Sequence, residues 1–82
     1  MKIPSKGETV MYDISDTEYA SVKLEDSNKF WVTISRIEKP FEKDEIIISV
    51  KDSNSIWFDT IEEVREYLLE KSDEAHKAQF QN

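Results

Sequence analysis

The chain has 82 residues, of which 38% are hydrophobic and 35% are charged, and its net charge at neutral pH is -7. A chain of this length is expected to form one domain, residues 1–82, and to bury only about 60% of the surface that its unfolded form exposes. It has no cysteine, which excludes disulfides and thiolate metal sites, and no apolar run long enough for a membrane span or a secretion signal. We therefore expect a cytoplasmic protein with no membrane partner.

Acidic residues are concentrated in the second half of the chain. Residues 1–41 carry seven acidic and six basic side chains, whereas residues 42–82 carry eleven acidic and five basic ones. Affinity for nucleic acid comes mostly from Lys and Arg that neutralise phosphates, so direct binding of nucleic acid is not expected. The expected partner is a protein with a basic surface.

An antiparallel β-meander is predicted over residues 8–58, after an extended lead-in at residues 1–7. Apolar and polar residues alternate along much of this region, which is typical of strands with one buried face. Ile37 falls out of the alternation of its strand, so we expect a bulge or a strand end near Arg36. The five predicted strands are residues 8–14, 19–25, 29–38, 45–51 and 56–58.

A nine-residue unit occurs twice within the meander, at residues 24–32 and 50–58. Each copy reads apolar, charged, Asp-Ser-Asn, polar, apolar, Trp, apolar. Asp can bond to the backbone downstream of it and Asn tolerates the left-handed conformation, so Asp-Ser-Asn is typical of a turn. A three-residue loop places the flanking apolar pairs on one face, whereas a shift of one residue exposes them. We therefore predict two hairpins, with Asn28 and Asn54 in the left-handed region.

An amphipathic helix is predicted over residues 60–75, which completes an α+β fold. Thr60 and Glu63 have the spacing of a capping box, in which each side chain bonds to the backbone amide of the other residue. Apolar residues then repeat at helical spacing, so one stripe should face the sheet. After Lys71, residues 72–74 either cap a second helical segment or continue the first, and residues 76–82 should form a frayed tail. The apolar stripe consists of Ile61, Val64, Tyr67, Leu68 and Ala75.

Acidic side chains occupy the face of the predicted helix opposite the apolar stripe. Carboxylates four residues apart stand roughly 6 Å apart along the axis, a spacing comparable to that of phosphates on a nucleic-acid strand. A solvated face, partly neutralised by Arg65, Lys71 and Lys77, is the commoner role of such residues. The alternative is a phosphate mimic that occupies a basic groove. This acidic ridge consists of Glu62, Glu66, Glu70, Asp73 and Glu74.

A second candidate surface contains Trp31, Trp57, Ile47 and Tyr19. These residues are out of phase with the predicted core, on a face where polar residues are typical. Three explanations compete. In the first, the helix covers this face; in the second, the sheet curls so that the rings pack on a rim; in the third, the face is exposed and binds a partner. Because so small a chain needs its large side chains for the core, we favour burial under the helix or at a rim.

A β-meander followed by a C-terminal helix, with Trp57 just before that helix, resembles the architecture of chromo and related small-barrel domains. The resemblance covers roughly the last half of the chain and rests on no sequence motif. It implies that the five-strand sheet curls, as in a small SH3-like barrel. It also implies that Trp31, Trp57 and Tyr19 form a pocket for a cationic side chain.

No pattern of catalytic, cofactor-binding or metal-binding residues stands out. His76 has no Cys or second His to act with it, the single Gly excludes glycine-rich phosphate loops, and the Asp-Ser-Asn units lack the Gly and distal Glu of calcium loops. We therefore predict a non-enzymatic protein that binds another protein and needs no cofactor.

Three forms of this binding function are considered. The favoured form is an inhibitor, of the kind that phages and mobile elements encode, which mimics nucleic-acid charge to block a basic nucleic-acid-binding protein. One alternative is a recognition module that holds a peptide or a cationic side chain on its Trp-containing face. The other is a structural or accessory subunit that self-associates through the same face.

Overall fold

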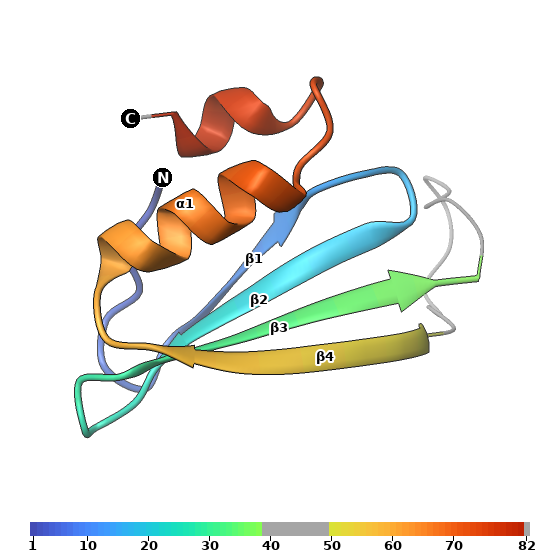
Figure 1. Cartoon of the computed structure of the whole chain (residues 1–82). Coiled ribbons are helices and arrows are strands. Elements are labelled where there is room, and N and C mark those ends of the chain that lie inside the picture. The colour runs from blue at the N-terminus through green and yellow to red at the C-terminus, as the bar shows by residue number, and fades with distance from the viewer. Residues whose placement is uncertain (39–49, 82) are drawn as a thin grey trace.

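The computed structural model describes residues 1–38 and 50–81, which form one antiparallel sheet and a helical layer (Figure 1). The sheet has four strands in the order β1-β2-β3-β4, and a helix follows the last strand. The α+β class and the antiparallel sheet are thus confirmed. The elements are β1 Thr9–Asp13, β2 Glu18–Leu24, β3 Phe30–Ile37, β4 Val50–Phe58, α1 Ile61–Lys71 and the short 3-10 helix η1 Lys77–Phe80.

The first predicted hairpin, between β2 and β3, is confirmed in its register and its turn. Leu24 lies opposite Phe30, as a three-residue loop requires. Asn28 has a φ of 68°, in the left-handed region, and its backbone N–H donates to the carbonyl of Glu25 at 2.9 Å. The N–H of Glu25 in turn donates to the carbonyl of Lys29 at 2.9 Å, which closes the loop.

The second predicted hairpin is wrong, because residues 50–58 form a single strand. β4 pairs with β3 along its length, and Asn54 lies opposite Ile34 in extended conformation. β4 lies at the edge of the described sheet, where polar residues are tolerated. The predicted strand at residues 45–51 lies mostly outside the described residues.

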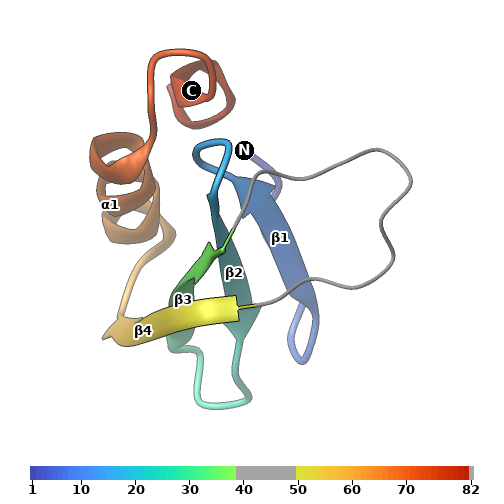
Figure 2. The same cartoon turned by 90° about the vertical axis from the view of Figure 1, so that its right-hand side faces the viewer.

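The sheet is open rather than curled into a barrel. β1 and β4 lie at opposite edges of the described sheet (Figure 2). The predicted five-strand curled sheet or small SH3-like barrel is therefore wrong in detail. Residues 50–58 are predicted to contain the end of one strand, a turn and a second strand. They form a single strand instead, which lies at the edge of the described sheet. The predicted bulge is confirmed, since the register of β3 and β4 shifts between Arg36 and Ile37.

The start of α1 is fixed by the Thr60 side chain, as the capping box predicts, but Glu63 bonds to the Thr60 hydroxyl rather than to the Thr60 backbone amide. The Thr60 hydroxyl oxygen accepts the backbone N–H of Glu63 at 3.2 Å, and the hydroxyl donates to the Glu63 carboxylate at 3.0 Å. Glu62 and Glu63 lie in the first turn, where the helix dipole favours negative charge. The helix therefore begins where the sequence places it.

The end of α1 differs from the prediction, because the helix stops at Lys71 rather than at residue 75. Ser72 has extended backbone angles, and its hydroxyl donates to the Leu68 carbonyl at 2.6 Å, which satisfies one terminal carbonyl of the helix. The N–H of Asp73 then bonds to the carbonyl of Ile14 at 2.9 Å. This bond holds the chain against the β1–β2 connection, so Ala75 is exposed and is not part of the helical stripe.

The core lies between α1 and one face of the sheet. Val64 and Leu68 are fully buried, and Ile61 and Tyr67 pack partly buried against the same cluster. β1, β2 and β3 contribute inward-facing residues that the alternation predicts, whereas Val50 and Ile56 of β4, also expected to face inward, are exposed. The other buried members of the cluster are Tyr12, Ile14, Ala20, Val22, Phe30, Val32 and Phe80.

The predicted frayed tail is wrong for residues 77–81. Lys77–Phe80 form η1, which lies beside α1 in Figures 1 and 2, and Phe80 is fully buried. The Phe80 ring meets the Tyr12 ring edge-on, with 5.3 Å between their centroids. The Gln79 side-chain amide donates to the Asp13 carbonyl at 2.7 Å. A chain with so small a core thus uses an aromatic side chain near its end to complete it.

Replacement of Phe80 by Ala should lower the free energy of unfolding by about 3–5 kcal/mol, because it leaves a cavity against Tyr12. Urea denaturation followed by circular dichroism measures this change. The matched control is Gln81→Ala, an exposed neighbour that should change stability by no more than about 0.5 kcal/mol. Equal stability of the two variants would contradict the packed C-terminus.

Candidate binding surfaces

Trp31 and Trp57 form a cross-strand pair on the face of the sheet opposite α1. They are direct partners in the β3–β4 register, and their ring centroids are 4.3 Å apart with an angle of 49° between the planes. Phe30 and Val32, on either side of Trp31, are buried in the core under α1, so the alternation of the strand directs Trp31 away from the helix. Trp57 is 50% exposed. The favoured prediction of burial under the helix or at a rim is therefore wrong.

Small hydroxyl side chains and charged side chains surround the Trp pair. Thr33 and Ser55 follow the two Trp on the same face, and their hydroxyls share a hydrogen bond of 2.9 Å. Lys23 lies directly opposite Trp31 on the neighbouring strand, and its ammonium is 3.5 Å from the Glu25 carboxylate. Met11, on β1, is 60% exposed. Lys29 and Asp59, each two residues from one of the Trp on the same face, pair at 3.6 Å. Two ion pairs of the protein's own side chains thus lie beside the rings.

Tyr19 does not lie next to the Trp pair. It is opposite Ser35, four residues along β3 from Trp31, which corresponds to roughly 13 Å. The three residues therefore do not form the cation pocket that the chromo-like resemblance implies, and the ammonium of Lys23 would repel a cation at Trp31. Ile47, the fourth member of this candidate surface, lies outside the described residues.

The acidic ridge divides into two parts. Glu62, Glu66 and Glu70 follow one another at intervals of four residues on α1, and all three are exposed. The ion pairs among residues 1–38 and 50–81 involve none of them. Lys71, the basic residue of the last turn, lies 5.5 Å from the centroid of the Tyr67 ring instead. These three carboxylates face solvent without a basic partner in the described chain.

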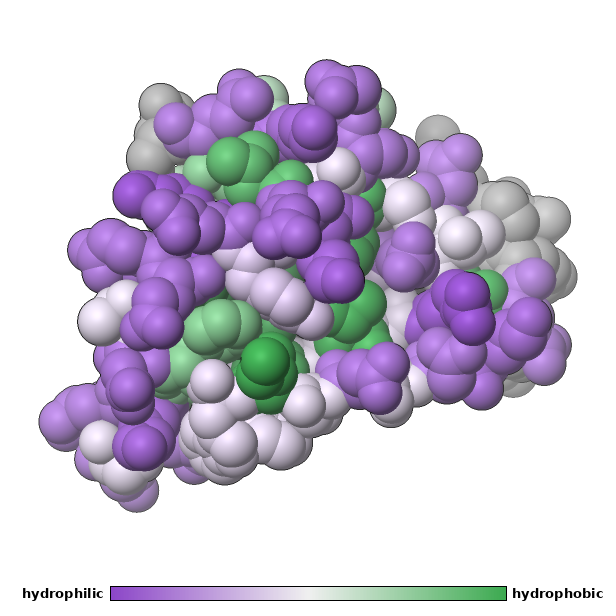
Figure 3. All heavy atoms as spheres, viewed as in Figure 1, coloured by the Kyte–Doolittle hydropathy of each residue, from purple (hydrophilic) through white to green (hydrophobic). Residues whose placement is uncertain are grey.

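Asp73 and Glu74, the other two members of the ridge, lie beyond the end of α1 and are paired. The His76 ring nitrogen Nδ1 is 2.7 Å from Oδ1 of Asp73, and this hydrogen bond lowers the pKa of the Asp73 carboxyl. The Lys77 ammonium is 2.9 Å from the Glu74 carboxylate. Figure 3 shows hydrophilic residues over most of α1 and η1, with hydrophobic side chains gathered between the helix and the sheet.

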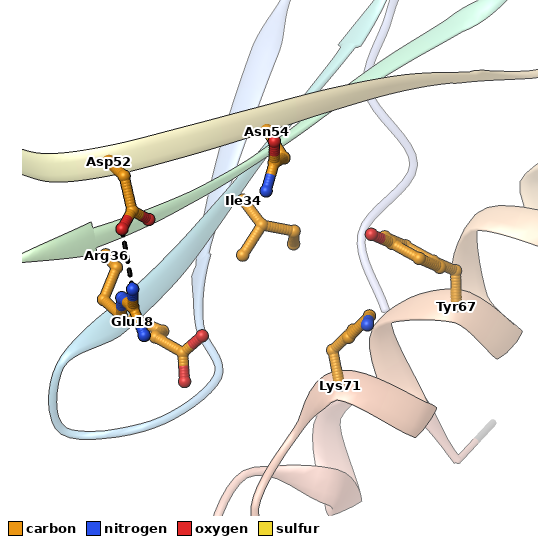
Figure 4. A pocket seen from close by; sticks show the side chains of 7 residues that line it. All are labelled: Glu18, Ile34, Arg36, Asp52, Asn54, Tyr67 and Lys71. Carbon is orange, nitrogen blue, oxygen red and sulfur yellow. Dashed lines mark hydrogen bonds and ion pairs between the residues drawn. The ribbon is translucent and has the colours of Figure 1, made fainter.

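The sequence did not reveal a hollow of about 300 Å³ between α1 and the β3–β4 side of the sheet. Glu18 and Arg36 lie at alternate positions after the inward-facing residues of β2 and β3. This alternation is the sequence pattern that could have predicted that both side chains point toward the helix. The sequence predicts a turn at Asp52 and Asn54, so it does not indicate that they line this hollow. Figure 4 shows the lining residues, which are Glu18, Ile34, Arg36, Asp52, Asn54, Tyr67 and Lys71.

An ion pair occupies one wall of the hollow. An Arg36 guanidinium nitrogen donates to Oδ2 of Asp52 at 2.7 Å, and the register places Glu18 on the other side of Arg36. The hydrogen bond to Asp52, with the charges of Asp52 and Glu18, raises the pKa of Arg36. Arg36 is therefore bonded to Asp52 on one side and lies in the electrostatic field of Glu18 on the other.

No three His, Cys, Asp or Glu side chains of the described residues are placed to hold a metal ion. None of the helices in the described part of the chain is long and apolar enough to cross a membrane. Comparison of the chain with protein-family models, with curated protein sequences and with solved structures finds no match. Any functional assignment must therefore come from the surfaces of the protein itself.

Replacement of Trp31 or Trp57 by Ala should leave a folded protein, because neither ring belongs to the core cluster. A double-mutant cycle of the two changes should give a coupling energy of about 0.5–1.5 kcal/mol, as expected for an aromatic pair. Thermal and urea unfolding followed by circular dichroism measure both quantities. Met11→Ala, on the same face but two strands from Trp31, is the control. Loss of cooperative unfolding in either Trp variant would assign that ring to the core.

Proposed function

We propose that the protein acts without catalysis, by binding a basic surface of another protein through the acidic ridge. The observation that carries this proposal is the row of Glu62, Glu66 and Glu70, which are exposed and have no basic partner among the described residues. Unpaired carboxylates can accept charge-assisted hydrogen bonds from Arg and Lys of a partner. The chain's net charge of -7 would also speed encounter with such a surface.

The geometry of the row supports a partner that normally binds nucleic acid. Each step of four residues advances about 6 Å along the helix and turns about 40° around it, so the carboxylates follow a shallow spiral. A groove whose Lys and Arg are spaced to contact successive phosphates could contact this row in their place. The protein would then be an inhibitor that competes with nucleic acid, of the kind that phages and mobile elements encode. It would act in the cytoplasm, where such partners work.

Replacement of Glu62, Glu66 and Glu70 together by Gln should abolish capture of the partner while leaving the fold intact. A pull-down from a cell lysate, with the bound proteins eluted by rising salt and identified, tests this. We expect the unmodified protein to retain a basic nucleic-acid-binding protein that elutes between about 0.1 and 0.5 M salt, because screening weakens exposed charge pairs. Added duplex DNA should compete for the same partner.

The matched control removes three exposed acidic charges elsewhere, through Asp16→Asn, Asp26→Asn and Glu38→Gln. It has the same net charge as the triple Gln variant, so it separates the position of the charges from their number. We expect the control to bind the partner nearly as well as the unmodified protein. Equal capture by the triple Gln variant would overturn the proposal.

The second candidate function is recognition of an extended peptide, or of a second copy of the chain, through the Trp pair. The exposure of Trp57 beside Trp31 favours it, because Trp side chains dominate the binding energy of many interfaces. β4 is also an edge strand of the described sheet, and backbone groups on such an edge can pair with an added strand. The nearby ammonium of Lys23 makes a cationic side chain the less favoured ligand.

Binding through the Trp pair should be nearly independent of salt and should be lost in Trp57→Ala. The triple Gln variant of the ridge is the control, and it should retain this binding. Sedimentation of the protein over a range of concentrations tests the second copy directly, and Trp57→Ala should shift any dimer to monomer. Partner capture and self-association that are both unchanged in Trp57→Ala would exclude this candidate.

A further inference from the structure

We infer that the hollow between α1 and the β3–β4 side of the sheet is a binding site for a small linear zwitterion, a molecule of dipeptide size with a carboxylate at one end and an ammonium at the other. The inference is independent of the row of Glu62, Glu66 and Glu70, which lies on the outer face of α1. It is carried by two groups of polar side chains at opposite ends of the hollow and an apolar residue between them.

One end of the hollow can bind a carboxylate. Tyr67 and Lys71 are four residues apart on α1, and Asn54 lies on β4; in Figure 4 all three side chains reach into the space between helix and sheet. The Tyr67 hydroxyl, the Asn54 amide and the Lys71 ammonium can each donate a hydrogen bond. Among the described residues, none of these three groups has a hydrogen-bond or ion-pair partner. A carboxylate has the acceptor capacity for all three.

The other end of the hollow can bind an ammonium. Glu18, Arg36 and Asp52 lie side by side on β2, β3 and β4, and together they carry one positive and two negative charges. Arg36 donates to Asp52 at 2.7 Å, whereas no ion pair within the described residues involves the Glu18 carboxylate. That carboxylate accepts the Ser15 hydroxyl at 3.3 Å. It therefore has free acceptor positions and a local excess of negative charge to attract a cation.

The register sets the length of the ligand. Glu18 lies two strands and two residues from Asn54, which corresponds to roughly 12 Å between their Cα atoms. Side chains stand roughly perpendicular to a sheet, so the Glu18 carboxylate and the Asn54 amide are about as far apart as their Cα atoms. Hydrogen bonds of about 2.8 Å at both ends then leave roughly 6 Å between the charged groups of the ligand. This matches a dipeptide better than a single α-amino acid. Ile34 lies between the two ends and offers an apolar contact, and the volume of about 300 Å³ admits a molecule of this size.

The test uses L-alanyl-L-alanine as the probe, with two blocked forms that each remove one charge. These are the N-acetylated dipeptide, which lacks the ammonium, and the dipeptide amide, which lacks the carboxylate. Nuclear magnetic resonance titration of the full chain follows the signals of Ile34, Asn54 and Tyr67. We expect saturable shifts with the dipeptide in the millimolar range, and binding at least tenfold weaker for both blocked forms. No saturable shift with the free dipeptide would overturn the inference.

Variants then connect each charge of the probe with its partner. Lys71→Gln should weaken binding of the free dipeptide about tenfold but should not alter the weak binding of the dipeptide amide, which has no carboxylate. Glu18→Gln should weaken binding of the free dipeptide about tenfold but should not alter the weak binding of the N-acetylated form, which has no ammonium. Glu66→Gln, on the outer face of α1, is the matched control and should bind as the unmodified protein does. Equal binding by all variants would overturn the inference and would leave the acidic-ridge proposal unaffected.

Discussion

The packing of α1 against one face of the sheet is the contact on which the rest of the structure depends. Val64 and Leu68 are fully buried there, opposite strand residues such as Val22 and Val32. One helix covers only one face of a four-strand sheet, so the side chains that point the other way face outward. The Trp pair and the carboxylates of the ridge are both consequences of this arrangement. The Trp pair lies on the face of the sheet that points away from the core, and the carboxylates lie on the face of α1 that points away from it.

The sequence was sufficient for features that depend on local chemistry and periodicity. The Asn28 turn, the Thr60 cap, the bulge after Arg36 and the inward-facing residues of β2 and β3 were all predicted. The two Asp-Ser-Asn segments show that local sequence alone does not determine the structure. The same three residues form a turn at residues 26–28 and part of a strand at residues 52–54. In the second segment, pairing with the free edge of β3 replaces the turn. Long-range pairing of this kind overrides local propensity and cannot be read from the segment itself.

The candidate surfaces were predictable to different degrees for the same reason. Exposure of Glu62, Glu66 and Glu70 follows from helical periodicity alone, so the sequence placed these residues correctly. The burial of Phe80 and the hollow near Arg36 require contacts among three or more elements. The fate of the Trp pair required knowledge of which face of the sheet the helix covers. Alternation showed that the two rings share a face, but it did not show that this face is opposite α1.

The charges of α1 link its stability to the proposed partner. Like charges four residues apart destabilise a helix by about 0.2–0.5 kcal/mol per pair, so the row of Glu62, Glu66 and Glu70 weakens the element that holds the core together. Glu62 offsets part of this cost because it lies in the first turn, near the positive end of the helix dipole, whereas Glu70 lies near the negative end. A basic surface docked on the row would remove the repulsion. Binding and folding would then reinforce each other, since a partner that binds only the folded chain stabilises it.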